Sequence, residues 1–197
     1  MNKKLTRNDL WSLEEYSDQR TTFRQKILGH KQNRQISLGN HLRLCFEDML
    51  TIKYQIQEML RIEKIFDANG IQEELDAYNP LIPDGKNWKA TLMIEYEDAT
   101  ERKERLGDLI GVENTIWIQI NDFDIVYPIC DEDLDRANDT KTSAVHFLRY
   151  ELTHDMITAA KQTKEVFLGV SHPNLSIPKT KLRTEIQEAL TEDLVLL

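Results

Sequence analysis

The sequence predicts an α+β fold, with a helix and a hairpin first, a helical pair next and a mainly antiparallel sheet last. Three observations support this prediction. Apolar residues recur at helical spacing in residues 5–31 and 51–66, and they alternate at strand spacing in residues 36–46 and in several later segments. The chain has 197 residues, of which 40% are hydrophobic and 30% charged, so it can bury a core without disulfides or metal ions.

The N-terminal part is predicted to form a helix over residues 5–31 and then a hairpin. Asn8 can cap the helix, and Gly29 favours its end. The string RQISLGNHLRLCFED then alternates between apolar and polar residues on both sides of a Gly39-Asn40 turn. The pattern is typical of two short antiparallel strands with one buried face.

A helical pair follows the hairpin. We expect one helix over residues 51–66 and a shorter one over residues 71–78, separated by Asn69-Gly70. The string NPLIPDG ends the second helix, because Pro80 keeps the preceding residue out of the helical region.

The second half contains two strand–helix–strand patterns. The first covers residues 89–121, with Asp98 and Glu101 as a capping signal. The second covers residues 143–172, with Thr153 as the cap. They indicate an internal duplication or two crossover units, and a ferredoxin-like sheet is one way to combine them.

The remaining segments complete the predicted organisation. We expect a short strand in DIVYPIC, a polar connector in DEDLDRANDTK, a linker in PNLSIPK and a final helix over residues 182–190. The apolar end LVLL must then dock on the protein or form an oligomer contact. We therefore predict one α+β domain with a C-terminal appendage, divided as a helical and hairpin part (1–85), a sheet-rich part (86–175), and a linker with a helix (176–197).

Bulk properties exclude several classes of protein. No apolar run approaches the roughly 20 residues of a membrane span, and the N-terminus has no apolar signal region. Cys45 and Cys130 are far apart and form no CxxC motif, so we expect a cytoplasmic protein without a disulfide framework. A net charge of −9 disfavours nucleic acid as a partner.

Positive charge is nevertheless concentrated near the N-terminus. Residues 1–45 hold nine Lys and Arg but four Asp and Glu, and no acid occurs between Gln19 and Phe46. Such a segment can dock an acidic partner, or it can pair with the acidic remainder of the same chain. The candidate docking residues are Arg20, Arg24, Lys31, Arg34 and Arg43.

One carboxylate interrupts the apolar stripe of the helix over residues 51–66. At 100° per residue, Glu63 falls about 20° from Ile56, near the centre of the stripe. A buried carboxylate needs a partner or a raised pKa. Glu63 is thus either a structural ion pair, with Arg149 as the expected partner, or one wall of a polar pocket.

Further polar residues can complete such a pocket. Arg149 and Glu151 share one face of a predicted strand, while His146 shares the other face with apolar residues. Carboxylates and a histidine together suit a hard cation or non-haem iron, although no established metal or catalytic motif is present. The candidate set is Glu58, Glu63, Glu73, Glu74, His146, Arg149 and Glu151, and the sequence specifies neither a metal nor a cofactor.

Three strings carry a family resemblance: CFEDMLTIKYQIQEMLRIEKIF, EELDAYNPLIPDGKNWKATLMIEY and TSAVHFLRYELT. They resemble a family of uncharacterised bacterial proteins with a domain of unknown function. The similarity extends from LTRNDLWSLEEY to about GVSHP, so the segment after about residue 176 is expected to lie outside it. The resemblance implies genes beside those for rubrerythrin-like proteins and an iron–sulfur oxidoreductase, but it implies no catalytic residues.

These observations leave three functional hypotheses. The first, which the resemblance favours, is an accessory protein that binds a redox partner in a cytosolic redox or peroxide-defence context. The second is a small metal-binding protein or enzyme that uses Glu63 with Glu58, His146 or Arg149. The third is a structural homodimer formed through the apolar residues 194–197.

Overall fold

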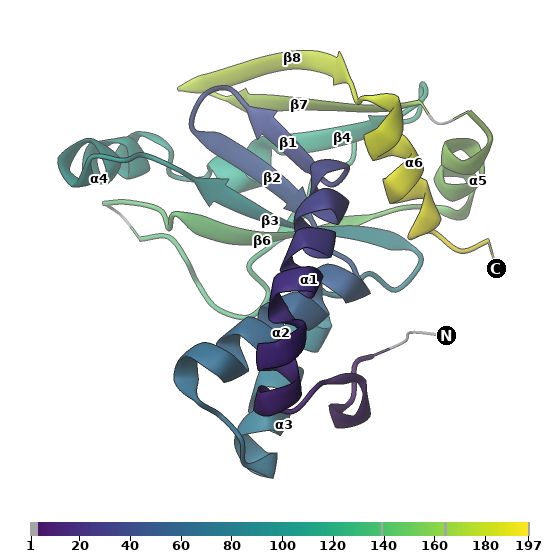
Figure 1. Cartoon of the computed structure of the whole chain (residues 1–197). Helices are drawn as coiled ribbons and strands as arrows, with labels where there is room; N and C mark the ends of the chain where they lie inside the picture. Colours follow the sequence, from purple (N-terminus) through teal and green to yellow (C-terminus); the bar gives the residue numbers. More distant parts are fainter. Residues whose placement is uncertain (1–3, 139, 164, 197) are drawn as a thin grey trace.

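Two antiparallel sheets and a separate group of helices make up the computed structural model, which describes residues 4–138, 140–163 and 165–196 (Figure 1). The α+β class and the antiparallel pairing are therefore confirmed. Sheet A has the order β1 (Gln35–Leu38), β2 (Leu42–Phe46), β3 (Asn87–Ile94), β6 (Val145–Glu151) and β5 (Ile129–Cys130). Sheet B has the order β4 (Ile116–Ile120), β7 (Val166–His172) and β8 (Leu175–Lys181).

The main core lies between the two sheets. Alternate residues of β3 and β6, among them Trp88 and Tyr150, are fully buried. The Tyr150 hydroxyl donates to the carbonyl of Ile116 at 3.0 Å and so joins sheet A to sheet B. Three helices complete this core: α4 (Ala99–Asp108), α5 (His154–Thr163) and α6 (Thr184–Glu192).

The two predicted strand–helix–strand units form, but each divides its strands between the sheets. In the first unit β3 lies in sheet A and β4 in sheet B, and in the second β6 and β7 are divided in the same way. The equivalent strands then pair with each other, β3 with β6 and β4 with β7. A single ferredoxin-like sheet is therefore not confirmed.

The helical unit consists of α1 (Leu13–Gln32), α2 (Met49–Glu63) and α3 (Ala68–Tyr78), and it lies below the sheets in Figure 1. The first helix begins later than predicted, because Ser12 and Glu15 form a capping box and residues 7–9 form a separate 3-10 turn. Likewise Asp48 caps α2. None of the described helices is long and apolar enough to cross a membrane.

The C-terminal segment differs from the prediction. The expected linker PNLSIPK is largely strand β8, which pairs with β7. The apolar end is not free, because Leu194 is buried in the main core and the amide of Val195 donates to Gly85 at 2.9 Å. Leu196 is half exposed, and Leu197 lies outside the described residues.

Candidate functional site

The outer face of sheet A, opposite the core, carries the polar side chains of the strands. Side chains alternate along β3, so Trp88 and Ala90 are buried in the core while Lys89 lies on the other face. The same alternation in β6 puts Phe147 and Arg149 on the outer face, and Arg149 is the cross-strand partner of Lys89. The register thus sets two cations side by side on the two central strands.

A cleft of about 460 Å³ separates this face from the helical unit. Its walls come from α2, from α3 and from the 3-10 turn η2 (Asn79–Leu81), and its floor comes from β3 and β6. Much of the lining is apolar or aromatic, contributed by Met59, Tyr78, Leu81, Phe147 and Leu148. Volume and lining match those of a typical small-molecule site.

Lys89 has an unusual environment for a lysine. It is half-buried, and its Nζ donates to the carbonyl of Pro80 at 2.5 Å. No carboxylate among the described residues lies within ion-pair distance of it. Burial lowers the pKa of Lys89, and the nearby Arg149 lowers it further, although Asp84, Glu132 and Glu151 act in the opposite direction.

Arg149 differs from Lys89 because its charge is fully paired. Its Nε and Nη2 each donate to the carboxylate of Glu132 at 2.7 Å, and Nη1 contacts Glu151. These contacts raise the pKa of Arg149 and lower that of Glu132. Arg149 is therefore held as a fixed cation whose hydrogen-bonding capacity is largely used.

Glu74 is the cleft carboxylate with neither a counter-ion nor a hydrogen-bond donor among the described residues. It is half-buried on α3, and burial, followed by the charges of Glu63 and Glu73, raises its pKa. The other four cleft acids all have donors: Glu47 accepts from Thr51 and Thr91, Asp76 from Gln72, Glu132 from Arg149 and Asp133 from Arg136.

The sequence-predicted pocket is only partly assembled. Glu74 and Arg149 line the cleft, and Glu63 and Glu73 are close enough to Glu74 to raise its pKa. Glu63 itself is exposed, so its predicted burial is wrong. The apolar stripe of α2 is covered as far as Leu60, but Glu63 is the last residue of the helix and extends beyond the core.

Glu58 lies in a separate ion-pair cluster with α1. Its carboxylate accepts from the Tyr16 hydroxyl at 2.6 Å, from Arg20 at 2.8 and 2.9 Å, and from Arg61 at 3.2 Å. The hydrogen bonds from Arg20 lower the pKa of Glu58 to about 2. Glu58 therefore joins two helices and is absent from the cleft lining.

His146 and Glu151, which were also predicted to line the pocket, are absent from the cleft lining. His146 is fully buried on the core face of β6, with Nδ1 2.6 Å from Asp131 and Nε2 2.8 Å from Thr142. Glu151 contacts Arg149 and accepts from Asn87 at 2.9 Å. Within the described ranges, no group of three or more His, Cys, Asp or Glu is arranged to hold a metal ion.

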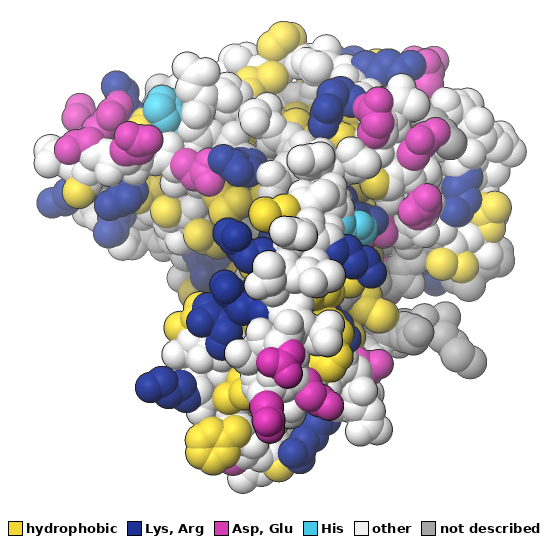
Figure 2. Space-filling view, viewed as in Figure 1, with side chains coloured by type: hydrophobic (Ala, Val, Ile, Leu, Met, Phe, Trp, Pro, Cys, Tyr) yellow, Lys and Arg dark blue, Asp and Glu magenta, His cyan; other side chains and the backbone are white. Residues whose placement is uncertain are grey.

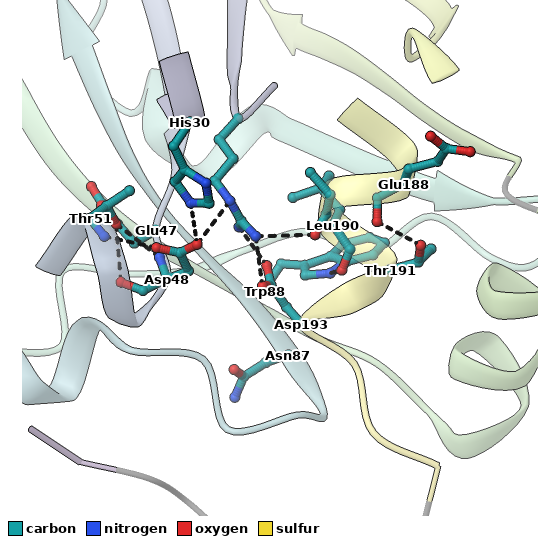
Figure 3. Close-up of polar contacts among 12 residues, drawn as sticks. His30, Glu47, Asp48, Thr51, Asn87, Trp88, Glu188, Leu190, Thr191 and Asp193 are labelled. Atoms are coloured by element: carbon teal, nitrogen blue, oxygen red, sulfur yellow. Dashed lines mark hydrogen bonds and ion pairs between the residues drawn. The ribbon is translucent and has the colours of Figure 1, made fainter. Parts of the chain in front are cut away.

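Most residues of the predicted basic patch form ion pairs with acidic residues of the same chain. Arg34 is 3% exposed and donates to Asp193 at 2.7 and 2.9 Å, and its Nε lies 3.0 Å from Asp48. Asp48 also contacts His30 (Figure 3). Arg20 pairs with Glu58, and Arg43 pairs with Glu95.

Two of the five predicted docking residues, Arg24 and Lys31, have no ion pair with another described residue, and both lie on α1. Arg24 is exposed, and Lys31 is half-buried with its Nζ 5.8 Å from the ring centre of Tyr54. Lys and Arg side chains flank α1 across the middle of the face in Figure 2. A smaller basic surface than the sequence predicted therefore remains.

Lys89 was missed by the sequence reasoning. Its strand was predicted, and strand alternation alone indicates that Lys89 and Thr91 share the face opposite Trp88 and Ala90. What the sequence does not show is that η2 and α3 lie over this face and leave Lys89 half-buried.

Comparison with known proteins gives a family but no activity. A family model described as "Protein of unknown function (DUF3501)" matches residues 4–194. A solved structure described as a novel protein of unknown function from Burkholderia pseudomallei K96243 is 48% identical, with a TM-score of 0.94. It covers 98% of this chain and 100% of its own. No significant match was found among curated proteins. The family match includes the C-terminal helix, so the expected limit near residue 176 is wrong.

Proposed function

We propose that this chain, which belongs to the DUF3501 family, binds a small, largely apolar organic molecule in the cleft between α3 and the outer face of sheet A. A volume of about 460 Å³ and an apolar lining with a few polar groups support this proposal. Two titratable groups with shifted pKa values, Lys89 and Glu74, line the same cleft, which is typical of functional sites.

The charges of the cleft favour a neutral or cationic ligand. Five carboxylates and two cations line it. The observation that carries the proposal is Glu74, a half-buried carboxylate repelled by two other glutamates and lacking a counter-ion among the described residues. An ammonium group or a hydrogen-bond donor on a ligand would supply the missing partner, whereas a ligand carboxylate would be repelled.

Three probes with the same phenylpropyl body test this preference: phenylpropylamine, hydrocinnamyl alcohol and hydrocinnamate. Calorimetric titration should give the order amine, alcohol, carboxylate, from tightest to weakest. Glu74→Gln should reduce the advantage of the amine over the alcohol. Glu73→Gln is the matched control, since Glu73 is exposed on the same helix and absent from the cleft lining. Tightest binding of hydrocinnamate, or equal effects of the two substitutions, would contradict the proposal.

Docking of an acidic protein on α1 is a second candidate function. Arg24 and Lys26 are exposed on this helix, and neither has an ion pair with another described residue. In a protein with a net charge of −9, such a patch favours an oppositely charged partner. A redox or peroxide-defence role for that partner is implied by the family resemblance.

A binding measurement tests this second candidate. A purified rubrerythrin-like protein is the probe, and reversal of Arg24 and Lys26 to Glu should weaken its binding, most strongly at low salt. Arg34 is unsuitable for such a test because it is buried in an ion-pair network. Undiminished affinity after the double reversal would exclude α1 as the docking surface.

A further inference from the structure

We propose that Lys89 is a nucleophile that forms an imine with an aldehyde or ketone bound in the cleft. This inference rests on the proposed function, because the carbonyl compound must first occupy the cleft. It assigns a chemical class to the ligand, namely a neutral carbonyl group on an apolar body. The claim combines the position of Lys89 in the cleft, the absence of an ion-pair partner for it among the described residues, and the neighbouring Arg149.

The position of Lys89 is fixed by the fold. It lies on β3, which pairs with β2 on one side and β6 on the other, so its backbone is held by both neighbours. Its Nζ donates one hydrogen bond to Pro80 on the opposite wall. The side chain of Lys89 therefore reaches from the floor of the cleft to its η2 wall, and a carbonyl carbon bound in the cleft can approach its amine.

Its surroundings favour the neutral amine. A lysine becomes more nucleophilic when burial in an apolar pocket or a neighbouring cation favours its neutral form, and Lys89 is half-buried in the cleft beside Arg149. Burial is the main cause that lowers the pKa of Lys89. Arg149 adds to this effect, while Asp84, Glu132 and Glu151 oppose it without reversing its direction. By contrast, Lys181 is paired with Glu165 at 2.7 Å, and Lys86 is exposed.

The reaction consumes one amine and one carbonyl group and releases one water. The lone pair of Nζ attacks the carbonyl carbon, the C–N bond forms as the C–O π bond breaks, and the proton that nitrogen loses passes to the oxygen to give a neutral carbinolamine. Protonation of that hydroxyl lets it leave as water while nitrogen donates its electrons into the C=N bond. Glu74 lines the same cleft, and its raised pKa suits it to the role of proton donor.

Reductive trapping tests the inference directly. The full-length protein is incubated with hydrocinnamaldehyde and cyanoborohydride, which delivers hydride to the imine carbon and leaves a stable secondary amine. Adducts are then located by peptide mass spectrometry. Lys89 should be modified several-fold faster than Lys86, and Lys89→Arg should remove this rapid modification. The matched variant Lys86→Arg, three residues away and exposed, should leave it unchanged.

Hydrocinnamyl alcohol separates this inference from the proposed function, since it has the same body but cannot form an imine. If the alcohol binds and slows trapping at Lys89, both claims are supported. If it binds in the cleft but Lys89 reacts no faster than Lys86, the imine is excluded while the binding function stands. If it does not bind and labelling is spread evenly over exposed lysines, both claims fail. A thermal melt of Lys89→Arg confirms that the variant is folded.

Discussion

Replacement of Arg34 by Met should destabilise the protein strongly, although the sequence suggested that Arg34 is a surface docking residue. Its guanidinium donates two hydrogen bonds to Asp193 and one, of 3.1 Å, to the carbonyl of Ala189, and it lies 3.0 Å from Asp48. These contacts tie the segment after α1 to both α2 and α6 (Figure 3). Met fills a similar volume but leaves two carboxylates without their cation.

Removal of one partner from a buried ion pair costs about 3–5 kcal/mol, because the remaining charge stays buried. For a chain of this size, each kcal/mol corresponds to about 2–4 °C, so the melting temperature should fall by roughly 6–20 °C. Urea denaturation and calorimetry measure the two quantities. Arg24→Met is the matched control, because Arg24 is exposed and its loss should change stability by less than about 0.5 kcal/mol.

The pH dependence of the destabilisation tests whether the unpaired charge of Asp193 is its cause. Burial raises the pKa of Asp193 above its unfolded value of 3.8, and Arg34 opposes that shift. A group whose folded pKa is raised stabilises most below the unfolded pKa and loses this contribution as pH rises through the folded pKa. Loss of Arg34 raises the folded pKa further, so the defect should shrink in mild acid. A cost below about 1 kcal/mol, or a defect independent of pH, would refute the reasoning.

Four other substitutions test separate parts of the structure. Glu58→Gln should lower the free energy of unfolding by about 1–2 kcal/mol at neutral pH. This is less than the free energy that corresponds to the full pKa shift of Glu58, because its arginine partners are over one-third exposed and solvent screens their charges. In the wild type this contribution is present above pH 4.5 and lost toward pH 2, so urea titrations of wild type and variant should converge in acid. Glu74→Gln should raise the melting temperature, since it removes a repelled half-buried charge, and an unchanged or lower value would contradict its assigned environment. Gly169→Ala should destabilise the protein by about 1–3 kcal/mol, because the added Cβ would lie 2.2 Å from the side chain of Trp117. Gly29→Ala, in open space on α1, should instead stabilise the protein by about 0.5–1 kcal/mol.

Local patterns in the sequence were sufficient for most elements of the fold. The Gly39-Asn40 turn, the Asp98 cap and the alternation in β4 and β6 depend on neighbouring residues, and all were predicted correctly. β8 was missed because Pro178 and a run of polar residues are typical of a linker. Its pairing with β7 at the edge of sheet B is a tertiary contact that no local pattern reveals.

The candidate site shows the same division between local and tertiary information. The helical wheel put Glu63 on the correct stripe of α2, but the extent of the core along that helix depends on how distant elements pack. The expected ion pair between Arg149 and Glu63 is wrong, because Arg149 pairs with Glu132 and Glu151. Lys89 acquires its properties from Pro80 and α3, which cover it only after folding.

Chemical-shift mapping of phenylpropylamine on labelled protein tests the central claim most directly. Binding in the cleft predicts saturable shifts of the side-chain methyl groups of Met59, Ala77 and Leu81, which line it from three elements. At a hundredfold excess over Kd, the ligand should also stabilise the protein by about 2.7 kcal/mol. Shifts confined to residues outside the cleft, or no saturable shift at millimolar ligand, would contradict the assignment of this cleft as the binding site.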